Sequence, residues 1–275
     1  MKTVLGSKLR LLLAAPAPLQ RMVMYDRYNR EVSRTGEKEL TILDCLSKPG
    51  STAVDVGANL GAYSFAMSRL GLNVLSFEPN PDLAGLIRRL RLPNVEVFSE
   101  ALSDTGGEAV LSIPIMRSGH VLASLEKDVL DKTGAPVQAL DIRKRTLDDL
   151  RLDSVSLLKI DTEGHEEKVL KGSLETLKKC KPSIVIEIEE RHNKGGISRI
   201  KALLSDIGYR GFFIFEGRLQ DIDKFDAAIH QDARELSVTH IARDLRYATN
   251  FIFLDNDRDH REIGRVIDAR MCQRR

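Results

Sequence analysis

Short apolar runs alternate with amphipathic segments through most of the chain. The apolar runs predict buried strands at residues 52–56, 73–77, 95–99, 157–160, 184–188, 212–215 and 250–254. Between them, apolar positions with helical spacing predict helices at 62–70, 82–91, 166–179 and 197–207. Strands that alternate with helices on this scale are typical of a doubly wound α/β sheet, in which ligands bind at the carboxyl ends of the parallel strands.

Three regions lie outside this alternation. Residues 108–113 and 136–142 predict two further strands, which we interpret as an inserted β-hairpin within about residues 106–145; a solvated loop without a role is the alternative. Residues 1–50 form a predicted helical lead-in, and residues 256–275 form an arginine-rich tail that we expect to be a solvated helix. The main domain is therefore expected over residues 51–255.

The first twenty residues have some features of a secretory signal. Their apolar run, Leu11–Ala17, is only seven residues long, contains Pro16 and follows Lys8 and Arg10. This pattern favours a helix or arm packed on the domain. No apolar run approaches the roughly 20 residues of a membrane helix, so we expect a cytoplasmic protein without stable membrane insertion.

Composition and charge disfavour several classes of function. The 275 residues are 42% hydrophobic and 30% charged, which suits a packed core, and 42 basic against 40 acidic residues leave a net charge of only +2. A protein that grips nucleic acid usually has a strong basic excess, so we expect no nucleic-acid partner. The three cysteines are far apart in sequence, which indicates neither a disulfide framework nor a zinc site. The oligomeric state is not predicted by these features.

A glycine-containing loop joins the first predicted strand to the first helix. Gly57 and Gly61 would let a nucleotide approach the backbone at a helix N-terminus, although a tight, closely packed turn is the alternative. Glu78 ends the next strand, 21 residues after Gly57, which is a suitable spacing for a carboxylate that binds both ribose hydroxyls. The loop therefore predicts a nucleoside-binding site.

The same loop disfavours a dinucleotide. Asn59 and Ala62 stand where a dinucleotide-binding loop has glycines, so an NAD-dependent oxidoreductase is a remote alternative. Asp55 is expected at the mouth of the loop, where its charge would repel a pyrophosphate. It would suit a ligand with an ammonium and a sulfonium group, as in S-adenosylmethionine (SAM).

The motifs VDVGANLGAYSF (54–65), SFEPNP (76–81), EALSD (100–104) and LLKIDTEGHEEKVLKG (157–172) resemble the FkbM family of SAM-dependent methyltransferases. The resemblance extends from about Glu39 to Leu254. It implies the class I methyltransferase (Rossmann-like) fold, which has a seven-stranded sheet whose last strand is antiparallel, and O-methylation of sugars or polyketides. It also implies that the cofactor SAM contacts Asp55, Gly57, Asn59 and Gly61 with its methionine part, Glu78 with its ribose, and Ala101 and Leu102 with its adenine.

Carboxylates and histidines gather where the fourth and fifth main-sheet strands end, and these ends are neighbours in a doubly wound sheet. Asp161 is the first candidate for contact with the methionine end of SAM or with the acceptor hydroxyl. His165 is the best candidate for the base, because the ordinary pKa of histidine lies near neutral pH. Glu163 is a further catalytic candidate, although it and Gly164 would equally serve to turn the chain, and Glu166 would favour the next helix. The acceptor-binding candidates are Glu187, Glu189, His192 and, in the inserted segment, His120.

We assign no metal ligands, although a divalent cation bound by Asp161 and neighbouring acids is an alternative. Lys159 lies inside a strand, where a side chain that snorkels to water or pairs with a carboxylate is favoured over a chemical role. The leading hypothesis is a SAM-dependent O-methyltransferase that acts on a carbohydrate, glycolipid or other small-molecule hydroxyl. The alternatives are a methyltransferase for nucleic acid or protein, and a non-catalytic SAM-binding or scaffolding module.

Overall fold

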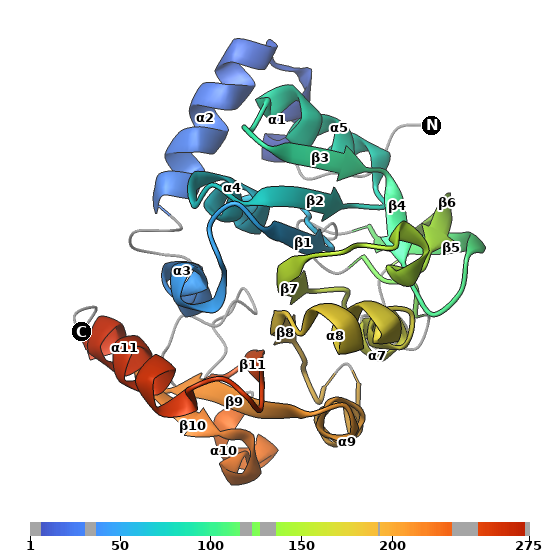
Figure 1. The fold of residues 1–275 in the computed structure, drawn as a ribbon. Coiled ribbons are helices and arrows are strands. Elements are labelled where there is room, and N and C mark those ends of the chain that lie inside the picture. Colours follow the sequence, from blue (N-terminus) through green and yellow to red (C-terminus); the bar gives the residue numbers. More distant parts are fainter. Residues whose placement is uncertain are drawn as a thin grey trace.

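The computed structural model describes residues 7–30, 37–115, 123–126, 136–191, 193–232 and 247–272. An eight-stranded sheet with the order β10-β9-β11-β8-β7-β1-β2-β3 forms its centre (Figure 1). The strands of this sheet are β1 (Thr52–Val56), β2 (Asn73–Phe77), β3 (Val95–Phe98), β7 (Val155–Ile160), β8 (Ser183–Glu187), β9 (Tyr209–Phe215), β10 (Arg218–Asp221) and β11 (Asn250–Asp255).

The predicted doubly wound sheet and its antiparallel last strand are confirmed. Strands β3, β2, β1, β7 and β8 are parallel, and β11 runs antiparallel between β8 and β9. The prediction of seven strands is wrong by one, because the chain turns at Glu216 and Gly217, both with positive φ, and β10 pairs back on β9. The sequence of β10, Arg-Leu-Gln-Asp, is too polar to stand out as a buried strand.

Helices cover both faces of this sheet (Figure 1). One face packs against apolar residues of α3, α4 and α11, and the other against residues of α7, α8 and α9. A third cluster joins α2, α4 and α5 beside β3. The helices are α1 (Ser7–Ala14), α2 (Ala17–Arg30), α3 (Leu43–Leu46), α4 (Ala62–Arg69), α5 (Pro81–Leu90), α7 (Glu166–Lys171), α8 (Leu174–Cys180), α9 (Gly196–Asp206), α10 (Ala227–His230) and α11 (His260–Cys272), with 3-10 turns at Lys38–Thr41, Asp148–Leu150 and Ile222–Lys224.

Two helices differ from their predicted form. The helix expected at 166–179 is divided into α7 and α8 at Gly172, where a Cβ would overlap the backbone oxygen of Ser103. Helix α11 is not simply solvated, because Ile267 and Met271 are buried against the sheet. Within the described residues, none of the helices is long and apolar enough to cross a membrane.

The inserted hairpin is confirmed as part of a second, smaller sheet. Strands β5 (Gly107–Pro114) and β6 (Val137–Arg145) pair antiparallel, and β4 (Glu100–Leu102) adds a parallel strand on the other side of β6. The order is therefore β4-β6-β5. The sequence does not reveal β4, because three residues are too few for a recognisable pattern.

Candidate functional site

Gly57 brings the carboxyl end of β1 against the carboxyl end of β7. The loop is fixed to β2 because the backbone amides of Gly57 and Ala58 both donate to the oxygen of Phe77, at 2.9 and 3.0 Å. Gly57 has φ = 77°, and a Cβ on it would overlap the backbone oxygen of Asp161. The chain therefore needs glycine here for its own packing, and not only to leave space for a ligand.

Glu78 lies beside this loop at the end of β2. Its Oε2 accepts from the amide of Asn59 at 2.7 Å, and its Oε1 accepts from the amide of Asn80 at 2.8 Å. The residue is 6% exposed, and burial raises its pKa to about 7. Within the described residues, Asn59 Oδ1 and Asn80 Nδ2 are buried without a hydrogen-bond partner. An acceptor and a donor beside Glu78 thus remain for a polar ligand, which fits the nucleoside part of SAM.

Asp55 does not lie at the mouth of the loop, contrary to the sequence-based expectation. It is 2% exposed inside β1, and its Oδ2 accepts from Ser64 Oγ of α4 at 2.6 Å. Burial raises its pKa to about 6. Asp55 therefore anchors α4 on the sheet, and its predicted contact with the methionine part of SAM stays a prediction.

Two further predicted cofactor contacts belong to the buried interior. Ala101 packs in the core of the small sheet, and Leu102 packs in the core of the main sheet. Gly61 precedes α4 with φ = 84°, and Ile87 and Tyr28 pack against it. The contacts of these three residues with SAM stay predictions.

An acidic hollow lies where β7 and β8 end. Asp161 is 29% exposed, and its carboxyl group is within hydrogen-bonding reach of Glu187. Burial and the charge of Asp161 raise the pKa of Glu187 well above its usual range, and burial also raises the pKa of Asp161, so the two carboxyl groups titrate as a pair. The hollow is lined by Asp161, Glu163, Gly164, Glu166, Glu187, Glu189 and Asn193.

Lys159 lies in β7, two residues before Asp161, which follows the end of this strand. Its Nζ lies 3.9 Å from Asp161 Oδ2 and donates to Asn250 Oδ1 at 2.8 Å. The predicted pairing with a carboxylate is confirmed. The sequence did not indicate Asn250 as a partner, because it is 91 positions away on β11.

The remaining acids of the hollow have partners. Glu166 Oε1 accepts from the amides of Thr162 and Gly164 at 3.1 and 2.9 Å, so this carboxylate holds the turn that carries Glu163. Glu189 pairs with Arg191 and accepts from Tyr247 Oη at 3.1 Å. Arg191 and Tyr247 were not predicted, since neither belongs to a recognisable motif. Among the described residues, no group of three or more histidine, cysteine or acidic residues is arranged to hold a metal ion.

His165 does not line the hollow. It is 5% exposed, and its Nδ1 and Nε2 lie 2.6 Å from Glu126 Oε1 and 3.0 Å from Ser103 Oγ. Both ring nitrogens therefore have hydrogen-bond partners outside the hollow, which indicates a structural role for His165. The other two predicted histidines, His120 and His192, lie outside the described residues.

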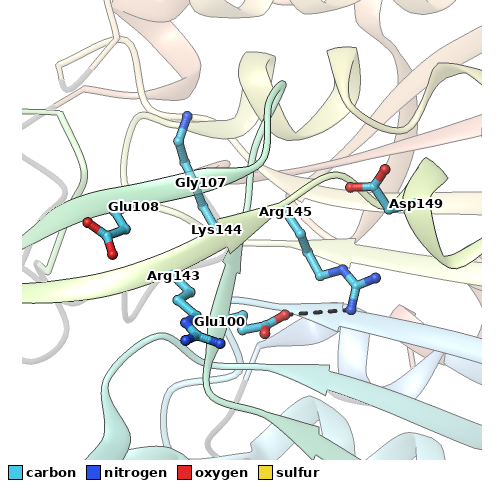
Figure 2. A pocket seen from close by; sticks show the side chains of 7 residues that line it. All are labelled: Glu100, Gly107, Glu108, Arg143, Lys144, Arg145 and Asp149. Atoms are coloured by element: carbon cyan, nitrogen blue, oxygen red, sulfur yellow. Dashed lines mark ion pairs between the residues drawn. The ribbon is translucent and has the colours of Figure 1, made fainter.

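A larger cavity of about 390 Å³ lies on the small sheet (Figure 2). It contains none of the predicted site residues and combines three basic with three acidic side chains, including an Arg145–Glu100 ion pair of 3.7 Å. The mixed charge gives it no preference for the sign of a ligand. Its lining residues are Glu100, Gly107, Glu108, Arg143, Lys144, Arg145 and Asp149.

The known proteins to which this chain is similar are methyltransferases, as the loop and strand-end motifs predict. Methyltransferase sdnD of Sordaria araneosa is 30% identical in an alignment of 189 residues that covers 57% of this chain and 72% of sdnD. Hexuronic acid methyltransferase AglP of Haloferax volcanii is 28% identical over 138 residues, which cover 49% of this chain and 54% of AglP. Methyltransferase FkbM from Methylobacillus flagellatus KT is a similar solved structure, with a TM-score of 0.47 and 16% identity over 79% of this chain and 50% of that one.

The methyltransferase FkbM domain matches residues 55–211. This match is more than half of the chain and includes the glycine loop, Glu78, the small sheet and the acidic hollow. The cofactor of such enzymes is SAM, which fits the polar groups left unpaired around Glu78. The chain thus belongs to the FkbM family and is a SAM-dependent methyltransferase.

Proposed function

We propose that this enzyme methylates a hydroxyl oxygen of a sugar or a similar small molecule. The observation that carries the proposal is the position of Asp161, an accessible carboxylate that touches the cofactor loop through its backbone and faces the acidic hollow with its side chain. The hollow has a volume of only about 10 Å³, so it would take a single hydroxyl group of the acceptor, from which its carboxylates would accept a hydrogen bond. The name of AglP, a hexuronic acid methyltransferase, supports a sugar acceptor.

The cofactor would lie across the ends of β1 and β2. Glu78 would accept from the ribose hydroxyls, while Asn59 Oδ1 and Asn80 Nδ2 offer the acceptor and donor that the described residues leave unpaired. The backbone of residues 57–61 would follow the methionine part, and the segment containing Ala101 and Leu102 would border the adenine. When bound, SAM supplies a methyl group attached to a positively charged sulfur.

Asp161 would act as the base. The acceptor oxygen would form its bond to the methyl carbon while the bond from that carbon to sulfur breaks, and the electron pair of the broken bond would stay on sulfur. The hydroxyl proton would pass to the carboxylate of Asp161, and the ammonium of Lys159, 3.9 Å away, favours the charged form of this carboxylate. Glu163, Glu187 and Glu189 line the same hollow and would contact the acceptor.

The test uses purified enzyme with SAM labelled in its methyl group. Acceptors would include uronic acids, neutral oligosaccharides and hydroxylated polyketides, together with RNA and peptides, and NMR of the product would locate the methyl group. We expect a methyl ether on a sugar or small-molecule acceptor. Transfer only to RNA or peptide would contradict the proposal.

The role of Asp161 needs a separate variant. Asp161→Asn should lower turnover by roughly 10²–10⁴, the usual contribution of a positioned base, while calorimetry shows that SAM still binds. Asp153→Asn is the matched control, because Asp153 is exposed and pairs only with Lys179 among the described contacts. Normal turnover in Asp161→Asn would show that this carboxylate is not the base.

A further inference from the structure

Lys159 is a buried cation that methyl transfer itself does not require. It lies within β7, is 1% exposed, and its Nζ is 4.8 Å from the centre of the Tyr63 ring. Long basic side chains usually reach water, and a buried ammonium is costly unless it is paired. The position of Lys159 therefore calls for an explanation beyond packing.

Carboxylates surround this ammonium from several elements of the fold. Burial alone would favour the neutral amine, but the neighbouring negative charges raise the pKa of Lys159 above its usual range. Lys159 is thus charged throughout the functional pH range. The titratable groups that face it are Asp161 just after β7, Asp55 on β1, Glu187 on β8, Tyr63 on α4, and Glu37 and Glu39 before and within the first 3-10 turn.

Asn250 also fixes the position of the Lys159 ammonium. Asn250 Oδ1 accepts from Lys159 Nζ, while Asn250 Nδ2 donates to Glu37 Oε2 at 3.0 Å. Tyr63 Oη donates to the same Glu37 oxygen at 2.6 Å. The oxygen and the nitrogen of the Asn250 side chain therefore each have a hydrogen-bond partner, which fixes the orientation of this amide. Its oxygen holds Lys159 on the side of the sheet where Asp161 lies.

We propose that Lys159 is a positioning residue that pairs with the Asp161 carboxylate and orients it toward the acceptor, and that Asn250 and Glu37 hold Lys159 in that position. The proposal rests on the role of Asp161 as the base. Lys159 itself contacts neither the acceptor nor the methyl group. Without the charge of Lys159, the pKa of Asp161 would rise further, because the opposing effect of this ammonium would be lost while the neighbouring acidic groups remain.

The direct test is an NMR titration of the Asp161 carboxyl carbon in protein labelled with ¹³C-aspartate, with the signal assigned from Asp161→Asn. In Lys159→Met, the Asp161 titration should move upward by about one pH unit or more, since an opposite charge at this distance usually shifts a pKa by about 1–3 units. Lys159→Arg, which retains the charge, should restore most of the wild-type titration. Once an acceptor is identified, the pH dependence of kcat can be measured as well. In Lys159→Met its acidic limb should shift to higher pH, while KM for SAM changes little.

Lys178→Met is the control for loss of a lysine, because Lys178 is exposed on α8 and pairs with Glu175. If Lys159→Met does not fold, Asn250→Asp provides the test: a carboxylate at this position competes for the ammonium and should also raise the Asp161 titration. An unchanged Asp161 titration in either folded variant would overturn the role of Lys159. Normal turnover in Asp161→Asn would instead contradict the base assignment, whatever the titration shows.

Discussion

The backbone oxygen of Asp161 occupies the space that a Cβ on Gly57 would need. Gly57 also adopts φ = 77°, a conformation that residues with side chains rarely adopt. One glycine thus joins the two strand ends that carry the cofactor loop and the proposed base. Changes at Gly57 should consequently affect stability as well as cofactor binding.

Gly57→Ala should lower the free energy of unfolding by about 2–4 kcal/mol, which combines left-handed backbone strain with overpacking. In a thermal melt this corresponds to a Tm lower by roughly 5–15 °C. Gly50→Ala is a matched control, because Gly50 has the same φ of 77° but, among the described residues, nothing lies within 4 Å of the place that its added methyl group would take. Equal losses in the two variants would show that the contact with Asp161 is unimportant.

The buried carboxyl of Glu78 should make stability depend on pH. Its pKa is about 7 in the folded protein against an ordinary value of 4.5, so the folded state binds the proton more tightly. Its contribution to stability is therefore full below about pH 4.5 and is lost as the pH rises toward 7. Glu78→Gln should show a smaller fall in Tm over this range. A fall identical to that of the wild type would reject the assignment.

His165→Ala should reduce turnover by less than about tenfold, well short of the roughly 10²–10⁴ expected for a base, because both ring nitrogens face away from the hollow. Its Tm should nevertheless fall, since the variant leaves a gap between Glu126 and Ser103. Steady-state kinetics and a melt on the same sample separate the two effects. A folded variant with a loss of roughly 10² or more would return the base to His165.

Glu126 should contribute to stability in mild acid. The hydrogen bond from His165, together with Lys168, lowers the pKa of Glu126 to about 2 from 4.5. Its contribution is present above about pH 4.5 and is lost as the pH falls toward 2. Acid unfolding followed by circular dichroism should therefore begin at a higher pH and be less steep in Glu126→Gln. Superimposable acid transitions would contradict this linkage.

The main sheet could be predicted from sequence because buried parallel strands leave continuous apolar runs. The same runs located Glu78 and Asp161, since each follows such a run directly. Strand β10 was missed because an edge strand needs few apolar residues, and the break at Gly172 was missed because it depends on Ser103 in another part of the chain.

The orientation of site side chains was harder to predict than their position. His165 is adjacent in sequence to residues that line the hollow. Its ring nevertheless points toward its hydrogen-bond partners Glu126 and Ser103, which are 39 and 62 positions away. Asp55 similarly turns toward Ser64 on α4. In both cases a distant hydrogen-bond partner decides which way the side chain points, and spacing along the chain carries no information about that partner.

The antiparallel placement of β11 has a consequence for biosynthesis. This strand follows β8 and β9 in the chain but lies between them in the sheet, and those two strands do not pair with each other. As the chain leaves the ribosome, the facing edges of β8 and β9 have no partner until β11 emerges. During that interval their exposed backbone groups could pair with other nascent chains, so chaperone protection of these two strands would matter most just before β11 is made.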